Sequence, residues 1–150
     1  MYLLIYCEWL DSELVKRSLP NARFVTKVKV PDYRLVFTSF SEDDSRGVLE
    51  GGCHLAKATG YVLLGVLYEV SEEDLIRLDK LTRVENGRYT RKYLSVIDEE
   101  GKKYDAVAHC IKNPKGKSRP TKEYMNHMIK GAKEFSFPQD YIQSLTDWAL

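Results

Sequence analysis

The chain has 150 residues, of which 43% are hydrophobic and 30% charged, and its 23 basic side chains nearly balance its 22 acidic ones. One domain of this length buries roughly two-thirds of its unfolded surface, so a second domain is not required. The apolar content excludes a disordered chain, and the balanced charge excludes a globally basic nucleic-acid binder. We therefore expect a single domain over residues 1–150 that recognises any charged partner locally.

The first predicted element is an apolar, β-rich run from Tyr2 to Tyr6. Glu8 and Asp11 interrupt this run far short of the length of a signal or membrane segment, so we interpret it as a strand. Asp11 is a suitable N-cap for a short helix, which must end by Leu19-Pro20 because proline cannot continue a helix.

Two β-branched or aromatic runs then predict short strands at 22–30 and 33–37, and two further runs predict strands at 53–58 and 61–70. Turn residues divide them at Pro31-Asp32 and at Thr59-Gly60, and a polar, acidic stretch from Ser39 to Glu50 has loop character. The run 61–70 has almost no polar face, which is typical of a strand buried on both sides.

A capping-box variant, Ser71 with Asp74, predicts a helix that fades near Leu81. Two β-rich runs, 88–97 and 103–111, flank a turn with glycine and predict a hairpin. Helical spacing of apolar residues predicts one helix from about Thr121, with His127 off its buried face and in solvent, and Pro138 opens a last helix.

About seven short strands with three or four helices, not in strict βαβ alternation, indicate an α+β fold. We expect a mostly antiparallel, curled or barrel-like sheet with helices packed outside it. A doubly wound sheet is the weaker alternative.

Three cysteines, Cys7, Cys53 and Cys110, form an odd number without CxxC spacing. This pattern argues against a disulfide framework and a zinc knuckle, and it favours a reducing, cytoplasmic compartment. Cys53-His54 and His109-Cys110 each offer one ligand to a common site, because adjacent strand residues point to opposite faces, so we expect neither a metal nor a cofactor. Cys7 would form a nucleophile and base pair with His109 if the fold brings them together.

A basic loop between residues 112 and 122 precedes Tyr124. Such a loop can meet an anionic ligand or a nucleic acid, but the nearly neutral overall charge favours a solvated surface loop.

Short sequence motifs spread over nearly the whole chain follow one another in a specific order. They are Tyr6 before a helix, 17–23, Gly51-Gly52, 65–70, Leu78-Asp79, 87–89, Pro120, Tyr124, Gly131-Ala132, Pro138 and Tyr141. In order and spacing they resemble the γ-glutamylcyclotransferase-like family, which includes the plant AIG2-like group. The resemblance implies a small, mostly antiparallel β-barrel with flanking helices. It also implies a cavity where the first strand ends, at Tyr6-Cys7-Glu8-Trp9.

The resemblance further implies a reaction on small γ-glutamyl or amino-acid-like compounds. In the family, a Tyr-Gly-Ser-Asn loop after the first strand holds the glutamyl end of the substrate. A glutamate after the Leu-Asp of the middle helix is the acid/base catalyst. The α-amine attacks the γ-carbonyl and releases 5-oxoproline, and one carboxylate can serve both proton transfers.

This chain departs from that pattern on both sides of the implied cavity. Cys7, Glu8 and Trp9 stand where the family has Gly, Ser and Asn, and Thr82 stands where it has the catalytic glutamate. The hydroxyl of threonine is no base near neutral pH, and loss of an acid/base group typically lowers a rate by about 100- to 10,000-fold. The pocket positions that the resemblance implies are Tyr6, Cys7, Trp9, Thr82, Tyr89 and Tyr124, with His109 where a pocket tyrosine is common.

Three hypotheses for the function follow. The absence of the family's Tyr-Gly-Ser-Asn loop and of its catalytic glutamate favours a repurposed or inactive member that binds a small ligand or a partner. The second hypothesis is an active enzyme with a relocated carboxylate, Glu8 or Glu85, assisted by His109, although a glutamate in a loop is also typical of an exposed or capping residue. The third is an anion or nucleic-acid binder that uses the basic loop 112–122, whose affinity would fall steeply with salt.

Overall fold

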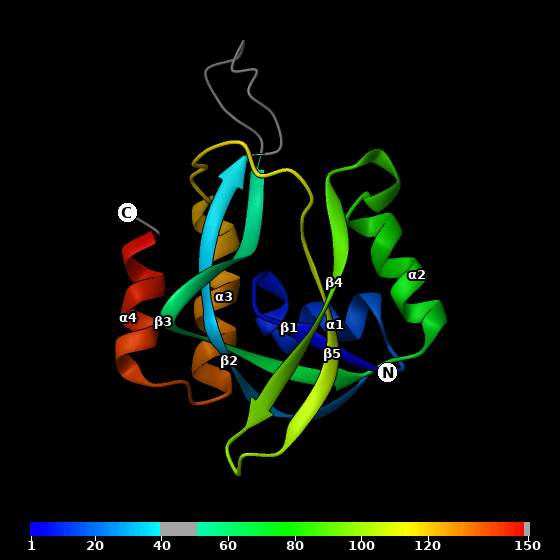
Figure 1. The fold of residues 1–150 in the computed structure, drawn as a ribbon, viewed down its shortest axis with the longest axis horizontal. Helices are drawn as coiled ribbons and strands as arrows, with labels where there is room; N and C mark the ends of the chain where they lie inside the picture. Colours follow the sequence, from blue (N-terminus) through cyan, green and yellow to red (C-terminus); the bar gives the residue numbers. More distant parts are fainter. Residues whose placement is uncertain (40–50, 149–150) are drawn as a thin grey trace.

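The computed structural model of the chain describes residues 1–39 and 51–148. Its elements are β1 (Tyr2–Ile5), η1 (Glu8–Leu10), α1 (Ser12–Ser18), β2 (Arg23–Ser39), β3 (Gly51–Glu69), α2 (Glu72–Leu81), η2 (Val84–Asn86), β4 (Tyr89–Asp98), β5 (Lys103–Ile111), α3 (Lys122–Glu134) and α4 (Gln139–Trp148). Figure 1 shows α2 on one side of the sheet and the pair α3 and α4 on the other. The acidic stretch predicted from Ser39 to Glu50 lies, apart from Ser39, outside the described residues.

The strands close into a barrel in the order β1-β3-β2-β4-β5. The pairing of β1 with β5 is parallel, and the other four pairings are antiparallel. This arrangement confirms the predicted α+β class and the mostly antiparallel barrel.

The prediction of seven strands is wrong, because the described residues form five, of which β2 and β3 are long. The pairing of β2 with β3 shifts register between Pro31 and Tyr33 but resumes beyond the shift. Asp32, with a φ of 64°, and Gly60, with a φ of 87°, meet at this point, where the Gly60 amide donates to Oδ1 of Asp32 at 3.0 Å. A bulge of this kind bends a strand without ending it, so residues that signal a turn lie inside continuous strands.

The helix boundaries follow their capping residues. Asp11 accepts a hydrogen bond from the Glu13 amide at the start of α1, and Thr121 accepts one from the Tyr124 amide at the start of α3. At α2 the capping box is complete, since the Ser71 hydroxyl binds the Asp74 amide and the Asp74 carboxylate binds the Ser71 amide. These three predicted helix starts are confirmed.

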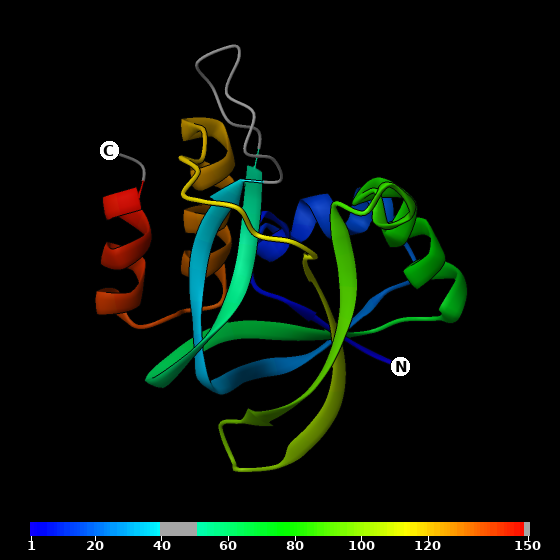
Figure 2. The ribbon, with the colours of Figure 1, turned by 45° about the horizontal axis from the view of Figure 1, so that its top comes forward.

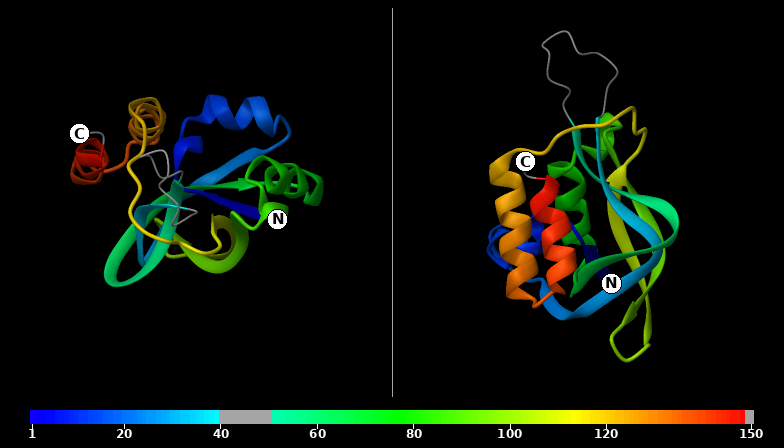
Figure 3. Two further views of the ribbon diagram at one scale, coloured as in Figure 1. Left: turned by 90° about the horizontal axis from the view of Figure 1, so that it is seen from above. Right: turned by 90° about the vertical axis from the view of Figure 1, so that its left-hand side faces the viewer.

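The apolar core fills the barrel and continues under α3 and α4. Met125 and Met128 of α3 and Leu145 of α4 are almost fully buried. Figure 3 shows the two helices side by side against the barrel. None of the helices in the described part of the chain combines the length and the apolar character that a membrane crossing requires.

Candidate functional site

A cavity of about 450 Å³ lies at the end of β1. Figure 2 shows η1 and α1 between α2 and α3, the helices that border this region. Eight side chains that were predicted from the sequence line the cavity. They come from the segment after β1, from η1, from the C-cap of α2, and from β4, β5 and α3: Tyr6, Cys7, Glu8, Trp9, Thr82, Tyr89, His109 and Tyr124. A volume of this size is typical of a pocket for a small molecule.

Cys7 is bonded to Cys53 of β3 in a disulfide at the wall of the cavity. The expectation that the cysteines form no disulfide is therefore wrong. A rule based on their number and spacing fails because β1 and β3, far apart in sequence, are paired neighbours in the barrel. A bond across a sequence separation of 46 residues stabilises a fold by about 2–4 kcal/mol. Cys110 is buried and free, and the cytoplasmic compartment stays a prediction.

The segment after Cys7 is also held from the side of α3. A Cβ added at Gly131 would lie 2.1 Å from the carbonyl carbon of Leu10, so the helix backbone touches this segment directly. The Asp11 carboxylate is buried and accepts a hydrogen bond from Nδ1 of His127 at 2.8 Å. The expectation that His127 faces solvent is wrong, because Asp11 draws the imidazole, which is half-buried, onto the segment.

Glu8 is the first residue of η1 and is partly buried at the cavity. Burial raises the pKa of its carboxyl, and the nearby carboxylates of Glu123 and Asp11 act in the same direction, whereas His127 acts against them. A carboxyl group with a raised pKa accepts and returns a proton at a pH closer to neutrality.

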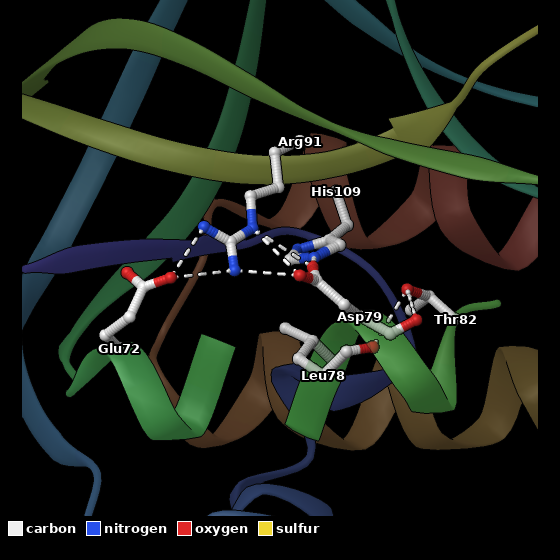
Figure 4. Close-up of polar contacts among 6 residues, drawn as sticks. All are labelled: Glu72, Leu78, Asp79, Thr82, Arg91 and His109. Atoms are coloured by element: carbon white, nitrogen blue, oxygen red, sulfur yellow. Dashed lines mark hydrogen bonds and ion pairs between the residues drawn. The ribbon is translucent and has the colours of Figure 1, made fainter. Parts of the chain in front are cut away.

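Across the cavity, α2 presents Thr82 and, one turn earlier, Asp79. The Thr82 hydroxyl donates to the carbonyl of Leu78 at 2.9 Å, so it is engaged by its own helix. Asp79 accepts hydrogen bonds from Arg91 of β4, at 2.8 Å from the Nη2 atom, and from His109 of β5, at 2.7 Å. Figure 4 shows both side chains reaching from the strands to Asp79, with Arg91 also bound to Glu72.

The proton positions in this network follow from the pKa values. Partial burial acts to raise the pKa of Asp79, but hydrogen bonds from Arg91 and His109 outweigh it and leave the pKa below its usual value. Burial lowers the pKa of His109, although Asp79 opposes this. An ionised Asp79 can only accept, so Nε2 of a neutral His109 carries the hydrogen and Nδ1 keeps the lone pair. Within the described residues this buried Nδ1 has no hydrogen-bond partner.

Three tyrosines complete the polar lining. The Tyr6 hydroxyl donates to the backbone carbonyl of His109 at 2.7 Å, and burial raises its pKa. Burial also raises the pKa of Tyr89 to about 12 and the pKa of Tyr124 well above its usual value. All three phenols are therefore protonated near neutral pH and can act as hydrogen-bond donors.

Glu85, the second candidate carboxylate, lies away from the cavity. Glu85 is exposed on η2 and is not among the described residues that line the cavity. Cys7 is held in the disulfide, so in this state it offers no thiolate to His109.

The basic loop 112–122 is tied to β2, where the Ser39 amide donates to the Gly116 carbonyl at 2.9 Å. Its proposed aromatic neighbour, Tyr124, lines the cavity and packs edge-on against Phe37. No cluster of three or more metal-ligating side chains occurs in the part of the chain that is described.

Asp79, Arg91 and Glu72 were not predicted as functional residues from the sequence. Asp79 was noted only as part of the Leu78-Asp79 motif, and its partners belong to other elements. The spacing of Asp79 and Thr82 could have indicated Asp79. It precedes Thr82, the position of the family's catalytic glutamate, by three residues and therefore lies on the same side of the helix.

The fold and the cavity define a class, namely small closed barrels with flanking helices and a pocket at the end of the first strand. A model of the AIG2-like family matches residues 62–145, which is more than half of the chain. The protein belongs to the AIG2-like family, which confirms the resemblance seen in the sequence.

Similar proteins agree with this assignment. The mouse and human proteins named gamma-glutamylcyclotransferase are each 25% identical over 134 residues, covering 89% of this chain and 71% of the relative. A solved structure of a gamma-glutamyl cyclotransferase superposes with a TM-score of 0.87 at 23% identity, over 97% of this chain and 86% of the other. YkqA from Bacillus subtilis gives a TM-score of 0.80 at 19% identity, over 99% of this chain and 54% of the other. At these identities the two structures establish the fold alone.

Proposed function

We propose that the protein is an enzyme of the cyclotransferase type that releases 5-oxoproline from small γ-glutamyl compounds, with Glu8 as its acid/base group. One observation carries the proposal: Glu8, Tyr89 and His109, from three separate elements, line the same cavity. The names of the mouse and human relatives support the substrate class. The carboxylate has moved from the helix, where Thr82 now stands, to the segment that follows β1.

The reaction needs two proton transfers that one carboxylate can perform. The α-ammonium of the substrate must lose a proton before its nitrogen can attack the γ-carbonyl, and the leaving nitrogen must gain one. Glu8 takes the first proton and delivers it to the leaving group. Its raised pKa suits this function, because a carboxyl group with an ordinary pKa holds a proton poorly near neutral pH.

His109 supplies the second functional group. Its imidazole forms part of the cavity wall beside the substrate, and the ionised Asp79 holds the ring in place through Nε2. Tyr89 and Tyr124 lie in the same lining and can donate to the substrate carboxylate or to the oxyanion that develops at the γ-carbon. Each group has a separate task in this scheme.

The test is direct: the protein is incubated with γ-glutamyl dipeptides and γ-glutamylamines, and 5-oxoproline is measured. We expect turnover to fall about 100- to 10,000-fold in Glu8→Gln and to persist in Glu85→Gln. The second variant is a matched control, since it makes the same substitution on the exposed surface of η2. Absence of turnover on all of these substrates, or equal loss in both variants, contradicts the proposal.

Binding without turnover is the second candidate function, and Thr82 favours it. With its hydroxyl donated to Leu78, this residue leaves the end of α2 without a group that can transfer protons. A non-catalytic member would bind γ-glutamyl compounds in the cavity and release no 5-oxoproline. Calorimetric titration of the same compounds separates the two candidates, because saturable binding without product supports only this one.

A further inference from the structure

The disulfide between Cys7 and Cys53 has an unusual location, since both cysteines line the cavity. The two residues differ in access. Cys53 lies inside β3 with only 2% of its surface exposed, whereas Cys7, after the end of β1, is partly exposed. Of the two residues, Cys7 therefore offers more surface to a small molecule that enters the cavity.

We propose that Cys7 is a reversible modification site for low-molecular-weight thiols that enter the cavity. The thiolate sulfur of such a compound bonds to Sγ of Cys7, and the bond between Cys7 and Cys53 breaks. The electron pair of the broken bond leaves on Sγ of Cys53, which takes up a proton from water. A second thiol then attacks the added sulfur, releases the small symmetrical disulfide and leaves Cys7 as a free thiol. In total, two thiols lose two electrons and the protein disulfide gains them.

Exchange at this position changes the wall that carries Glu8, which is the next residue. In the oxidised protein the segment is fixed at Cys7 by the disulfide, and beyond Glu8 by the contact of Leu10 with Gly131. A thiol bound to Cys7 releases the first attachment and places a substituent beside Glu8 in the cavity. The exchange itself is independent of the proposed function, and only its effect on turnover rests on that function.

The third cysteine provides an internal reference. Cys110 is buried in β5 and unpaired, and burial raises the pKa of its thiol, so it has little thiolate character. Small thiols and disulfides should leave Cys110 unmodified in the folded protein while Cys7 exchanges.

The oxidised, folded chain is treated with millimolar cysteamine, then denatured and alkylated with a maleimide at acidic pH, and the products are mapped by peptide mass spectrometry. We expect the cysteamine adduct on Cys7 alone, and the maleimide on Cys53 and Cys110, which the denaturant exposes as free thiols. Two single variants test the direction of attack with cystamine, the corresponding disulfide. Cys7 in C53S should form the adduct at least about tenfold faster than Cys53 in C7S.

Several outcomes would overturn the inference. One is a disulfide that resists cysteamine in the folded protein and opens only in denaturant. Others are equal rates in C53S and C7S, or an adduct on Cys110 at the rate of Cys7. Far-UV circular dichroism of both variants verifies that each is folded. The adduct is detected by its mass and not by enzyme activity, so the two proposals can fail separately. An adduct on Cys7 in a protein without turnover supports the exchange site and rejects the proposed function. Turnover without an adduct supports the proposed function and rejects the exchange site.

Discussion

The two walls of the cavity are held in different ways. On the wall that follows β1, covalent and steric contacts fix the backbone, through the Cys7 disulfide and the contact between Leu10 and Gly131. On the wall formed by α2, charged hydrogen bonds fix side chains, since Asp79 is held by Arg91 and His109. The first wall positions a backbone segment, and the second positions an imidazole ring.

The carboxylates on these walls also differ. Burial raises the pKa of Glu8, whereas Arg91 and His109 keep the pKa of Asp79 low against its partial burial. A carboxylate with a low pKa remains ionised and suits orientation of a neighbour, and one with a raised pKa suits proton transfer. Acid/base function is thus expected on the wall after β1 and not on the helix, where the family pattern places it.

The largest effect is expected from Gly131→Ala, which disturbs the backbone contact of the first wall. Its Cβ would lie 2.1 Å from the Leu10 carbonyl carbon and 2.5 Å from the Asp11 nitrogen, both of them backbone atoms. We expect the free energy of unfolding to fall by about 3 kcal/mol, because the helix and the segment must separate. Urea denaturation measures this loss.

Gly116→Ala is the matched control for this prediction. A Cβ at Gly116 would have Ser39 Oγ as its nearest neighbour, at 3.8 Å, which is an ordinary contact. Its stability should therefore change by less than about 0.5 kcal/mol. If Gly131→Ala is as stable as Gly116→Ala, α3 does not fix this wall.

Asp79→Asn disturbs the second wall, with a smaller expected effect. Arg91 loses the closer of its two charged partners and keeps Glu72, and the free energy of unfolding at neutral pH should fall by about 1–3 kcal/mol. The folded pKa of Asp79 is below its unfolded value, so the stabilisation is present above about pH 4 and is lost as the pH falls through the folded pKa.

The difference between Asp79→Asn and the unmodified protein should therefore shrink in acid. Urea denaturation at neutral and at acidic pH measures it. The same substitution at Asp105, which is exposed on β5, is the control and should have little effect at either pH. A difference that is constant across this range would show that Asp79 contributes no charge interaction.

Local signals in the sequence predicted the parts of the fold that local interactions determine. The caps at Asp11, Ser71 and Thr121 mark helix starts because a side chain binds an amide two or three residues away. The continuous strands β2 and β3 could not be predicted, since a turn and a bulge use the same residue types and only pairing with the partner strand distinguishes them.

The same distinction applies to the site. The pocket-facing residues were found through the order of the family motifs, which carries the arrangement of the whole barrel. The disulfide and the network around Asp79 were not found, because each joins residues from separate elements. Asp79 and His109 are 30 positions apart, and Cys7 and Cys53 are 46 apart. No local spacing encodes such contacts.

The smallest predicted effect is a gain of stability in Glu8→Gln, the variant that should lose turnover. The folded pKa of Glu8 is above its unfolded value of about 4.3, so folding favours the protonated form. The corresponding stability is present below this pH and is lost as the pH rises through the folded pKa. Glutamine is uncharged at every pH and avoids that loss.

At neutral pH, Glu8→Gln should therefore be more stable than the unmodified protein by at most about 1 kcal/mol, and this gain should vanish in acid. Thermal unfolding over a series of pH values measures it, with Glu85→Gln as the exposed control. A gain that depends on pH at Glu8 alone would mean that the cavity holds this carboxylate at a cost in stability, as expected of a group retained for catalysis. If Glu8→Gln is instead less stable at neutral pH, the ionised carboxylate stabilises the fold, and its position in the cavity needs no catalytic explanation.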